Sequence, residues 1–315
     1  MKILLFGKGG QVGWELQRSL APLGELVALD FDSTDHCGDF TNLEGLQATV
    51  RAIRPDVIVN SGAHTAVDKA ESEPDLVRTI NALAPAALAQ AAVACGAWLV
   101  HYSTDYVFDG SGQTPWLESD TPAPLSVYGR TKLEGEQLIQ ASGCKHLIFR
   151  TSWVYGARGG NFAKTMLKLA QEREVLKVID DQIGAPTGAE LLADVTAHAI
   201  RQALAGNGPG RQGANPNNLI SPAISGIYNL AAGGEISWFG YAKEIVAHVN
   251  TTKLATKLVV KTIDAVPSSA FPSAAQRPLN SRLNTAKLQG TFNITLPHWK
   301  TGVARMLTEF IEKQT

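Results

Sequence analysis

The stretch KILLFGKGGQVGWEL, residues 2–16, decides the fold. An apolar run leads directly into a glycine-rich turn and then into a segment with helical spacing. Gly7, Gly10 and Gly13 follow the spacing GxxGxxG, whereas Val12 stands where the spacing GxGxxG would need a glycine. Glycines at such a turn let the backbone approach a pyrophosphate, whose charge the amides of the following helix can bind. The stretch therefore predicts the strand, turn and helix that open a nucleotide-binding α/β domain.

Short apolar runs recur through the first half of the chain, separated by segments with helical spacing. They cover residues 2–6, 26–30, 56–60, 97–102 and 146–150. Because these runs are continuously apolar rather than alternating, they predict parallel strands covered by helices on both faces. We therefore expect an α/β fold, with a doubly wound parallel Rossmann sheet in residues 1–152 and a returning segment near 186–230.

The pattern loosens after Arg150, where we expect a smaller, interleaved α/β substrate lobe made of residues 153–185 and 231–315. Further strands are predicted at 175–179, 227–230 and 257–263, and helices near 161–171, 188–204, 238–248 and 299–313. Residues 205–226 are rich in Gly, Asn and Pro without periodicity, which predicts a surface loop.

The composition limits the partners. The 28 Lys and Arg and 29 Asp and Glu give a net charge of -1, and no long run of one sign occurs. We therefore expect neither nucleic acid nor an anionic membrane surface as a partner. Cys37, Cys95 and Cys144 form no CxxC pair, so neither a disulfide framework nor a zinc site is indicated, and a reducing cytoplasm fits best.

One segment, Thr79–Tyr102, has the apolar character of a membrane span. It is mostly alanine, however, contains Asn81 and Pro85, and is broken at Gly96. We interpret it as a buried helix followed by a buried strand.

The second apolar run ends in Asp30, about twenty residues after the glycine turn. A carboxylate at this position can accept hydrogen bonds from both adenosine ribose hydroxyls and would repel a 2′-phosphate. Taken alone, Asp30 therefore favours NADH over NADPH.

The segment VYGRTKLEGE places Tyr128 and Lys132 four residues apart on a predicted helix, so that both side chains share one face. Bringing a phenol pKa from about 10 to near neutrality costs about 4 kcal/mol, and a neighbouring ammonium acts in that direction. Such a pair taken alone is more often a structural surface contact.

The segment HYSTDYVFDG, residues 101–110, follows an apolar run, and on local sequence it fits a strand that ends in a polar turn better than the reactive edge of an enzyme's sheet. The order of the motifs distinguishes these interpretations. A glycine turn, then the hydroxyl-rich segment STD, then YxxxK resembles the short-chain dehydrogenase/reductase superfamily. The length and the second lobe fit its extended branch, whose members act on sugar nucleotides.

The resemblance is closer still to one family of that branch, the dTDP-4-dehydrorhamnose reductases. It is carried by LLFGKGGQVGWEL, NSGAHTAVDKAE, HYSTDYVFDG, YGRTKLEGE, RTSWVYG, NFAKTML, DQIGAPTGAELLAD and RPLNSRLNT. These motifs run in the family's order from residue 3 to about 285.

The resemblance implies NAD(P)H-dependent reduction of the C4 ketone of dTDP-4-dehydro-β-L-rhamnose to dTDP-L-rhamnose, for cell-surface polysaccharide. Tyr128 would donate a proton to the forming alkoxide. Lys132 would lower the tyrosine pKa and hold the nicotinamide ribose, and Thr104 would hydrogen-bond the carbonyl oxygen. Since the family is reported to accept NADH or NADPH, Asp30 alone does not fix the cofactor.

The resemblance also implies binding residues. Those at the cofactor, together with the glycine turn, would be Gly7, Gly10, Gln11, Val12, Gly13, Asp30, Asp39, Phe40, Ala63, His64, Thr65, Tyr102, Tyr128 and Lys132. Those at the substrate would be Thr104, Asp105 and Trp153, with Asn161 and Arg277 as candidates for nucleotide and diphosphate contacts. On their own chemistry, His64 fits a hydrogen-bonded structural residue, Trp153 a core aromatic, and Arg277 a surface ion pair.

Some members of the family are described as magnesium-dependent homodimers with glutamates at the subunit interface. The matching residues here are Glu15, Glu190 and Glu309, which otherwise fit solvated helix faces. The 205–226 loop is longer than usual for the family, which puts nearby dimer contacts in doubt.

Three other functions stay open. A sugar-nucleotide 4,6-dehydratase would carry Glu after the Thr-Asp pair, where this chain has Tyr106, which argues against dehydration. A 4-epimerase would keep the same motifs but show no net oxidation of cofactor. A non-catalytic regulatory subunit of methionine adenosyltransferase shares the fold, although retention of Thr104, Tyr128 and Lys132 argues against a purely binding role.

Overall fold

A single parallel sheet forms the centre of the larger part of the molecule. In the computed structural model, which describes residues 1–205, 224–251 and 257–312, six strands lie in the order β10-β5-β4-β3-β1-β2. Their bounds are β1 (Lys2–Phe6), β2 (Glu25–Leu29), β3 (Val57–Asn60), β4 (Trp98–Thr104), β5 (Lys145–Thr151) and β10 (Gly226–Asn229). All five pairings are parallel, so the predicted doubly wound sheet is confirmed.

The strand order reverses at β1, which has β2 on one side and β3 on the other. Leu5 pairs with Ala28 of β2 and with Val59 of β3. The loops that leave the carboxyl ends of β1 and β3 therefore diverge, and the crevice between them is where open α/β sheets bind ligands.

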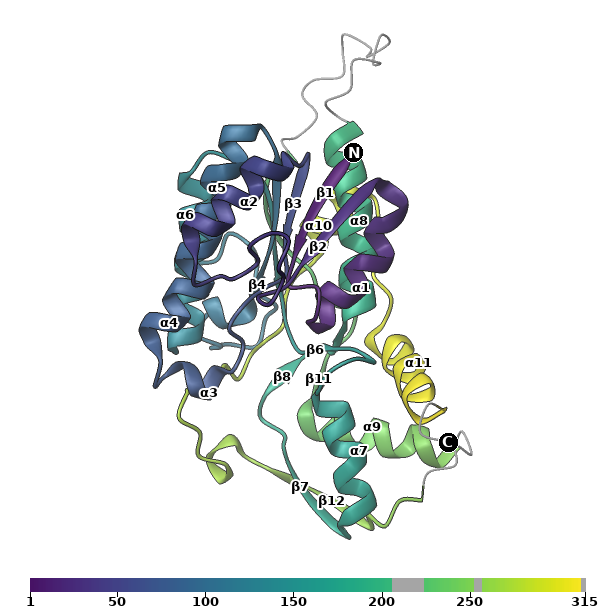
Figure 1. The fold of residues 1–315 in the computed structure, drawn as a ribbon. Helices are drawn as coiled ribbons and strands as arrows, with labels where there is room; N and C mark the ends of the chain where they lie inside the picture. The colour runs from purple at the N-terminus through teal and green to yellow at the C-terminus, as the bar shows by residue number, and fades with distance from the viewer. Residues whose placement is uncertain (206–223, 252–256, 313–315) are drawn as a thin grey trace, which may run out of the picture.

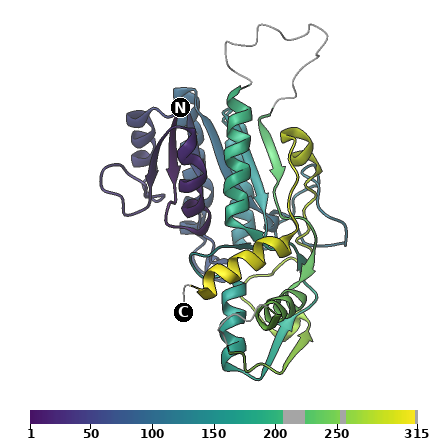
Figure 2. The same ribbon diagram turned by 90° about the vertical axis from the view of Figure 1, so that its right-hand side faces the viewer.

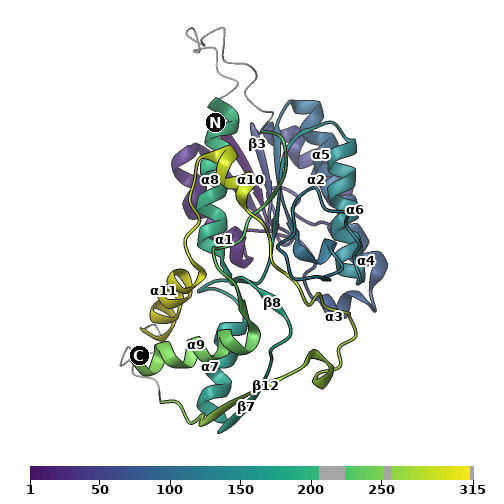
Figure 3. The same cartoon turned by 180° about the vertical axis from the view of Figure 1, so that it is seen from behind.

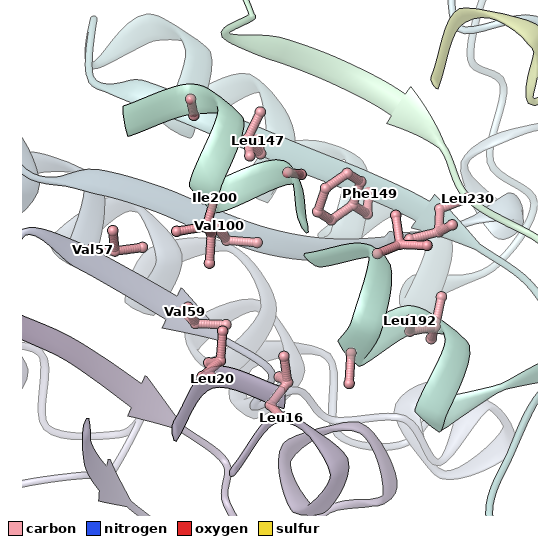
Figure 4. Close-up of a cluster of buried hydrophobic side chains, with 14 of the residues drawn as sticks. Leu16, Leu20, Val57, Val59, Val100, Leu147, Phe149, Leu192, Ile200 and Leu230 are labelled. Carbon is pink, nitrogen blue, oxygen red and sulfur yellow. The ribbon is translucent and has the colours of Figure 1, made fainter. Parts of the chain in front are cut away.

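Helices cover both faces of the sheet (Figures 1 and 3). One face carries α1 (Gln11–Leu20), α8 (Ala189–Ala205) and α10 (Ala286–Phe292), and the other carries α2 (Leu43–Ile53), α5 (Ala84–Cys95) and α6 (Val127–Ala141). Figure 4 shows the first of the two cores, in which Leu16 and Ile200 from the helices pack toward Val59 and Val100 of the sheet. Each such side chain, when fully buried, contributes about 1.5–3 kcal/mol.

The position of α10 differs from the expectation that all of residues 231–315 belong to the smaller lobe. Its Leu288 and Phe292 are fully buried in the core on the sheet face, against α8 and β10. After leaving the lobe the chain returns to the sheet, and this seven-residue helix buries its apolar side there.

The apolar segment resembling a membrane span is a core helix. Pro74–Cys95 is long and apolar enough to cross a membrane by length and composition only, and 56% of its apolar 18-residue stretch is buried inside the protein. It comprises α4 (Pro74–Arg78), a π-helical turn η2 (Thr79–Leu83) and α5. Pro85 has no N–H to bond the carbonyl of Asn81, which accounts for the irregular turn. The predicted buried helix and following buried strand are confirmed.

The smaller lobe lies below the sheet in Figure 2. It contains α7 (Phe162–Glu172), β7 (Val175–Ile179), α9 (Trp238–Thr251), β12 (Thr262–Val266) and α11 (Trp299–Glu312), and β7 and β12 pair in parallel. The strand expected at 257–263 therefore begins five residues later, at Thr262. The proposed domain boundaries themselves stay a prediction.

Short elements join the lobe to the sheet. They are β6 (Val154–Tyr155) paired with β9 (Thr187–Gly188), and β8 (Ile183–Gly184) paired with β11 (Ile236–Ser237), whereas α3 (Val67–Ala70) packs against α6. Residues 267–284 then cross back over the end of β4, where Asn280 N–H donates to the Gly110 carbonyl at 3.0 Å. The loop predicted at 205–226 lies outside the described residues except at its ends.

Candidate functional site

The glycine turn brings the end of β1 against the end of β3. Gly7 has a φ of +83°, and a Cβ there would lie 2.7 Å from the amide nitrogen of Gly62. A Cβ on Gly13 would lie 1.9 Å from the Gly7 carbonyl oxygen, so α1 can begin this close to the turn only with glycine there. Gly10 differs, because a Cβ on it would meet only that same oxygen at 3.5 Å. The fold itself therefore requires Gly7 and Gly13 but not Gly10.

Gly13→Ala is expected to lower the free energy of unfolding by about 3 kcal/mol, because its methyl group would overpack against backbone that cannot move aside. Gly10→Ala is the matched control and is expected to cost less than about 1 kcal/mol. Urea unfolding of both variants measures the difference. Equal losses would show that the close approach at Gly13 is not what requires glycine.

Asp30 directly follows β2 and is fixed by the turn. Gly9 N–H donates to its Oδ2 at 2.9 Å, and Phe31 N–H donates to its Oδ1 at 3.1 Å. A Cβ on Gly9 would lie 2.3 Å from Oδ2, so Gly9 is needed for this contact. We did not predict a role for Gly9, although its position in the run GKGG was a usable signal.

The other expected cofactor residues near this edge are held by neighbouring loops. Asp39 accepts hydrogen bonds from Thr41 N–H and Thr41 O–H, both at 2.8 Å. The buried ring of Phe40 packs edge-on against Phe6 and close to Gly62. These contacts lie at the carboxyl edge of the sheet, beside β1 and β3.

His64 is held through its backbone. Its N–H donates to Asn81 Oδ1 at 2.9 Å, and its carbonyl accepts from Asn81 Nδ2 at 3.0 Å. Its ring Nε2 lies 3.7 Å from Glu73 Oε2. These contacts fix the loop that carries Ala63 and Thr65, in agreement with the structural interpretation of His64.

A cavity of about 650 Å³ opens at the carboxyl ends of β1, β4 and β5. Of the residues predicted for the site, its lining includes Gly10, Gln11, Val12, Ala63, Thr65, Tyr102, Thr104, Asp105, Tyr128, Lys132, Trp153, Asn161 and Arg277. The lining does not include Gly7, Gly13, Asp30, Asp39, Phe40 or His64, which lie beside it on the same sheet edge. The structure thus brings most of the predicted site residues together.

Thr104 links Asp105 and Tyr128 at the end of β4. Its hydroxyl donates to Asp105 Oδ1 at 3.1 Å and accepts from Tyr106 N–H at 3.2 Å. Burial raises the pKa of Tyr128 to about 12, while the contact with the Thr104 hydroxyl lowers it and the Asp105 charge raises it. Tyr128 therefore stays protonated at neutral pH. The lowering of this pKa by Lys132 stays a prediction.

Asp105 is 2% exposed. Burial raises its pKa to about 6, and hydrogen bonds from the Ser281 and Thr104 hydroxyls act in the opposite direction. Ser281 comes from the segment that crosses back over β4, so the second part of the chain contributes to this carboxylate's environment. At neutral pH Asp105 is therefore ionised in most molecules. Its side chain lines the cavity.

Lys132 lies one helical turn after Tyr128 and is 2% exposed. Its Nζ donates to the Tyr102 carbonyl at 2.5 Å and lies 3.1 Å from His101 Nε2. Burial lowers the pKa of Lys132 to about 8, and the charge of Glu136 acts in the opposite direction. The amine is thus fixed at the cavity wall and titrates close to physiological pH.

Four buried polar atoms around the cavity have no hydrogen-bond partner in the part of the chain that the structure describes. They are Ser103 Oγ, Asp105 Oδ2, Thr151 Oγ1 and Ser152 Oγ. Buried polar atoms are nearly always paired, so this cluster is suited to a polar ligand. We did not predict Ser103, Thr151 or Ser152, although hydroxyl residues at the ends of two parallel strands were a usable signal.

Trp153, Asn161 and Arg277 each have a partner elsewhere in the protein. Trp153 has a φ of +50° and stacks on Trp238, with ring centroids 3.5 Å apart. Asn161 caps α7 by accepting from Lys164 N–H at 3.1 Å. Arg277 donates to Asp68 Oδ2 at 2.6 Å. The surface ion pair expected of Arg277 is therefore present, and all three side chains also line the cavity.

Glu15, Glu190 and Glu309 surround a separate pocket of about 350 Å³ on α1, α8 and α11. Arg18 and Arg305 share this pocket, and Arg18 already contacts Glu15 at 3.2 Å. Within residues 1–205, 224–251 and 257–312, no group of three or more His, Cys, Asp or Glu could hold a metal ion. A single chain therefore does not fit the predicted magnesium site.

The sequence profile described as RmlD substrate binding domain matches residues 1–312. The chain belongs to this family. A relative of the RmlD family, the dTDP-4-dehydrorhamnose reductase of Escherichia coli K12, is 58% identical over 309 residues, with 98% of each chain covered. The resemblance found in the sequence motifs is thereby confirmed.

Solved structures of RmlD-family proteins have the same architecture. A dTDP-4-dehydrorhamnose reductase from Clostridium acetobutylicum has a TM-score of 0.84 at 35% identity, covering 100% of this chain and 99% of that one. The enzyme from Bacillus anthracis, solved in complex with NADP, has a TM-score of 0.82 at 33% identity, covering 98% and 99%.

Proposed function

We propose that this chain reduces the C4 ketone of dTDP-4-dehydro-β-L-rhamnose to dTDP-L-rhamnose with NADPH or NADH, for the synthesis of cell-surface polysaccharide. The observation that supports this most strongly is that Thr104, Tyr128 and Lys132 line one cavity with the glycine turn. The near-complete coverage of reductases that are 58% identical supports the same substrate.

When bound, the nicotinamide supplies the hydride for C4. Tyr128 donates the proton to the forming alkoxide, and burial suits it to this role because it stays protonated at neutral pH. Thr104, whose hydroxyl already connects Tyr128 with Asp105, positions the carbonyl oxygen. Lys132, fixed by its contact with the Tyr102 carbonyl, holds the ribose and favours the phenolate that remains.

The remaining residues bind the two ligands. Cofactor contacts come from the glycine turn and from Asp30, Asp39, Phe40, Ala63, His64, Thr65 and Tyr102. The sugar lies among Asp105, Trp153 and the unpaired hydroxyls, and Asn161 and Arg277 face the nucleotide and diphosphate. Arg277 would then exchange its partner Asp68 for phosphate oxygens, which suit a guanidinium.

The function is tested by mixing purified protein with dTDP-4-dehydro-β-L-rhamnose and NADPH or NADH. We expect absorbance at the reduced-nicotinamide band to fall by one equivalent for each sugar consumed. An unchanged absorbance with altered sugar would indicate an epimerase, and no reaction would contradict both.

Asp30→Ala is expected to raise the ratio of kcat/KM for NADPH to kcat/KM for NADH by about ten-fold, because a carboxylate at this position repels a 2′-phosphate and binds a 2′-hydroxyl. The ratio is measured with both cofactors at saturating sugar nucleotide. An unchanged ratio would show that Asp30 does not face the ribose.

The alternative functions are less well supported. A dehydratase needs a carboxylate after Asp105, and Tyr106 instead packs edge-on against Tyr128, with ring centroids 5.4 Å apart. Likeness to a UDP-glucose 4-epimerase is at 18% identity and shows the fold alone. A regulatory role does not require the complete set of Thr104, Tyr128 and Lys132.

The proposal also covers the cellular location and the oligomeric state of the protein. Three free thiols, Cys37, Cys95 and Cys144, are consistent with the cytoplasm. A homodimer joined at the glutamate pocket would add carboxylates from a second copy to Glu15, Glu190 and Glu309. In that arrangement Mg²⁺ could be held between the subunits, which a single chain does not allow.

A further inference from the structure

A buried row of three side chains lies behind the cavity wall. Asn60 ends β3, and His101 pairs with it directly across the strands β3 and β4. Lys132 of α6 lies on the far side of the His101 ring. Asn60 and His101 are each 1% exposed, and neither lines the cavity. The row therefore contacts the cavity only through Lys132.

The orientation of the Asn60 amide is set by the backbone. Gly62 N–H donates to Asn60 Oδ1 at 3.0 Å, so that Oδ1 is the acceptor of that contact. Nδ2 then faces His101 Nδ1 at 3.0 Å. Since an amide nitrogen can only donate, His101 Nδ1 must accept and carry no proton.

The proton of His101 must then be on Nε2. Burial, and secondly the charge of Lys132, hold the pKa of His101 well below 6.5, so that the ring is neutral and has one N–H. This N–H points at Lys132 Nζ, 3.1 Å away. A neutral amine can accept such a hydrogen bond through its lone pair, whereas an ammonium has none and is repelled.

We propose that Asn60 and His101 are positioning residues for Lys132: Asn60 fixes the Nε2–H tautomer of His101, and this N–H favours the uncharged amine, which it holds against the Tyr102 carbonyl. The expected effect on kcat rests on the proposed reductase function, whereas the hydrogen-bond arrangement is independent of it. A chain of hydrogen bonds thereby links Gly62 N–H, in the turn after β3, to Lys132 through Asn60 and His101.

The arrangement favours the uncharged form of Lys132 and so adds to the effect of burial on its pKa. Other ionisable groups on the elements packed here include Tyr102 on β4, Asp105 and Tyr106 on η3 (Asp105–Val107), Arg150 on β5, and Tyr128 and Glu136 on α6. Glu136 acts in the opposite direction on the Lys132 pKa, and it is paired with Arg150 at 2.6 Å. Activity that needs the ammonium should therefore decline above about pH 8.

The tautomer is tested without any activity, by ¹⁵N NMR of the full chain labelled at its seven histidines. The His101 signals are assigned as those lost in His101→Gln. We expect a protonated Nε2 and an unprotonated Nδ1 that do not change between about pH 5 and pH 9. A protonated Nδ1, or titration near the ordinary histidine pKa, would overturn the proposal.

Two variants test the coupling to Lys132. His101→Gln places an amide oxygen where Nε2 was, and Asn60→Asp replaces the donor with an acceptor, which moves the ring proton to Nδ1. Both changes give the ammonium an acceptor. We expect the alkaline limb of kcat against pH to move upward by about one unit and kcat to fall by about ten-fold, with KM for the sugar nucleotide within about two-fold.

His101→Asn and His146→Gln are the matched controls. His101→Asn keeps a partner for Asn60 but cannot reach Lys132, so it should lose more activity than His101→Gln without the upward shift. His146 lies on β5, and its ring Nδ1 hydrogen-bonds the Cys144 carbonyl, so its variant should behave as wild type. An unmoved alkaline limb in both His101→Gln and Asn60→Asp would overturn the coupling. An inactive wild type would instead contradict the proposed function and leave the NMR result to decide the tautomer.

Discussion

Tyr128→Phe is expected to lower kcat by about a thousand-fold, because it removes the one proton donor proposed for the forming alkoxide. The phenylalanine ring keeps the buried packing against Ala70 and Val77 and the edge-on contact with Tyr106. Loss of activity would therefore reflect the missing hydroxyl rather than a collapsed site. Steady-state oxidation of NADPH with the sugar nucleotide measures kcat, and cofactor fluorescence measures binding, which should change by less than about two-fold.

Tyr228→Phe is the control for removing a buried phenol elsewhere in the sheet. Its hydroxyl donates to the Ile224 carbonyl at 2.7 Å, away from the cavity. We expect a small loss of stability and unchanged kcat. If Tyr128→Phe kept kcat within about ten-fold of wild type, another group would have to supply the proton.

Glu136→Gln is expected to lower the free energy of unfolding by about 3–5 kcal/mol, because it leaves the Arg150 guanidinium buried without its counter-charge. The Glu136 carboxylate accepts from Arg150 Nη2 at 2.6 Å and from Nε at 3.0 Å, with side chains that are 1% and 3% exposed. The pair fastens α6, which carries Tyr128, to β5. Urea unfolding measures the loss, and we expect the dependence of the free energy of unfolding on urea concentration to be unchanged.

Glu134→Gln is the matched control, two residues away on the same helix. Glu134 pairs with Arg78 at 2.6 Å, but these side chains are 31% and 52% exposed. We expect a loss of less than about 1 kcal/mol, since exposed ion pairs contribute little. Equal effects of the two substitutions would mean that burial does not determine the contribution of the Glu136–Arg150 pair.

The sheet was predictable from the sequence because its strands are buried on both faces and therefore read as uninterrupted apolar runs. The runs at 2–6, 26–30 and 56–60 correspond closely to β1, β2 and β3. The smaller lobe was less predictable from the sequence, since β12 begins at Thr262 rather than at residue 257. The position of α10 depends on contacts with α8 and β10, which no local pattern in its seven residues encodes.

The candidate site was predictable where local motifs carry it. Thr104, Tyr128 and Lys132 line one cavity, as the order of the motifs had indicated. The row of Asn60 and His101 was not predicted, because it depends on the register between β3 and β4, and forty-one residues separate the two in the chain. Their hydrogen bonds become visible only when the strands are paired.

The central claim is that hydride is delivered to C4 of the sugar nucleotide at this cavity. The most direct measurement uses NADPH or NADH that carries deuterium at the transferable position of the nicotinamide, with dTDP-4-dehydro-β-L-rhamnose and purified wild-type protein. The account predicts one deuterium at C4 of dTDP-L-rhamnose for each equivalent of cofactor oxidised, and almost none with Tyr128→Phe over the same time. A product without deuterium at C4, or cofactor that is not oxidised while the sugar is consumed, would contradict it.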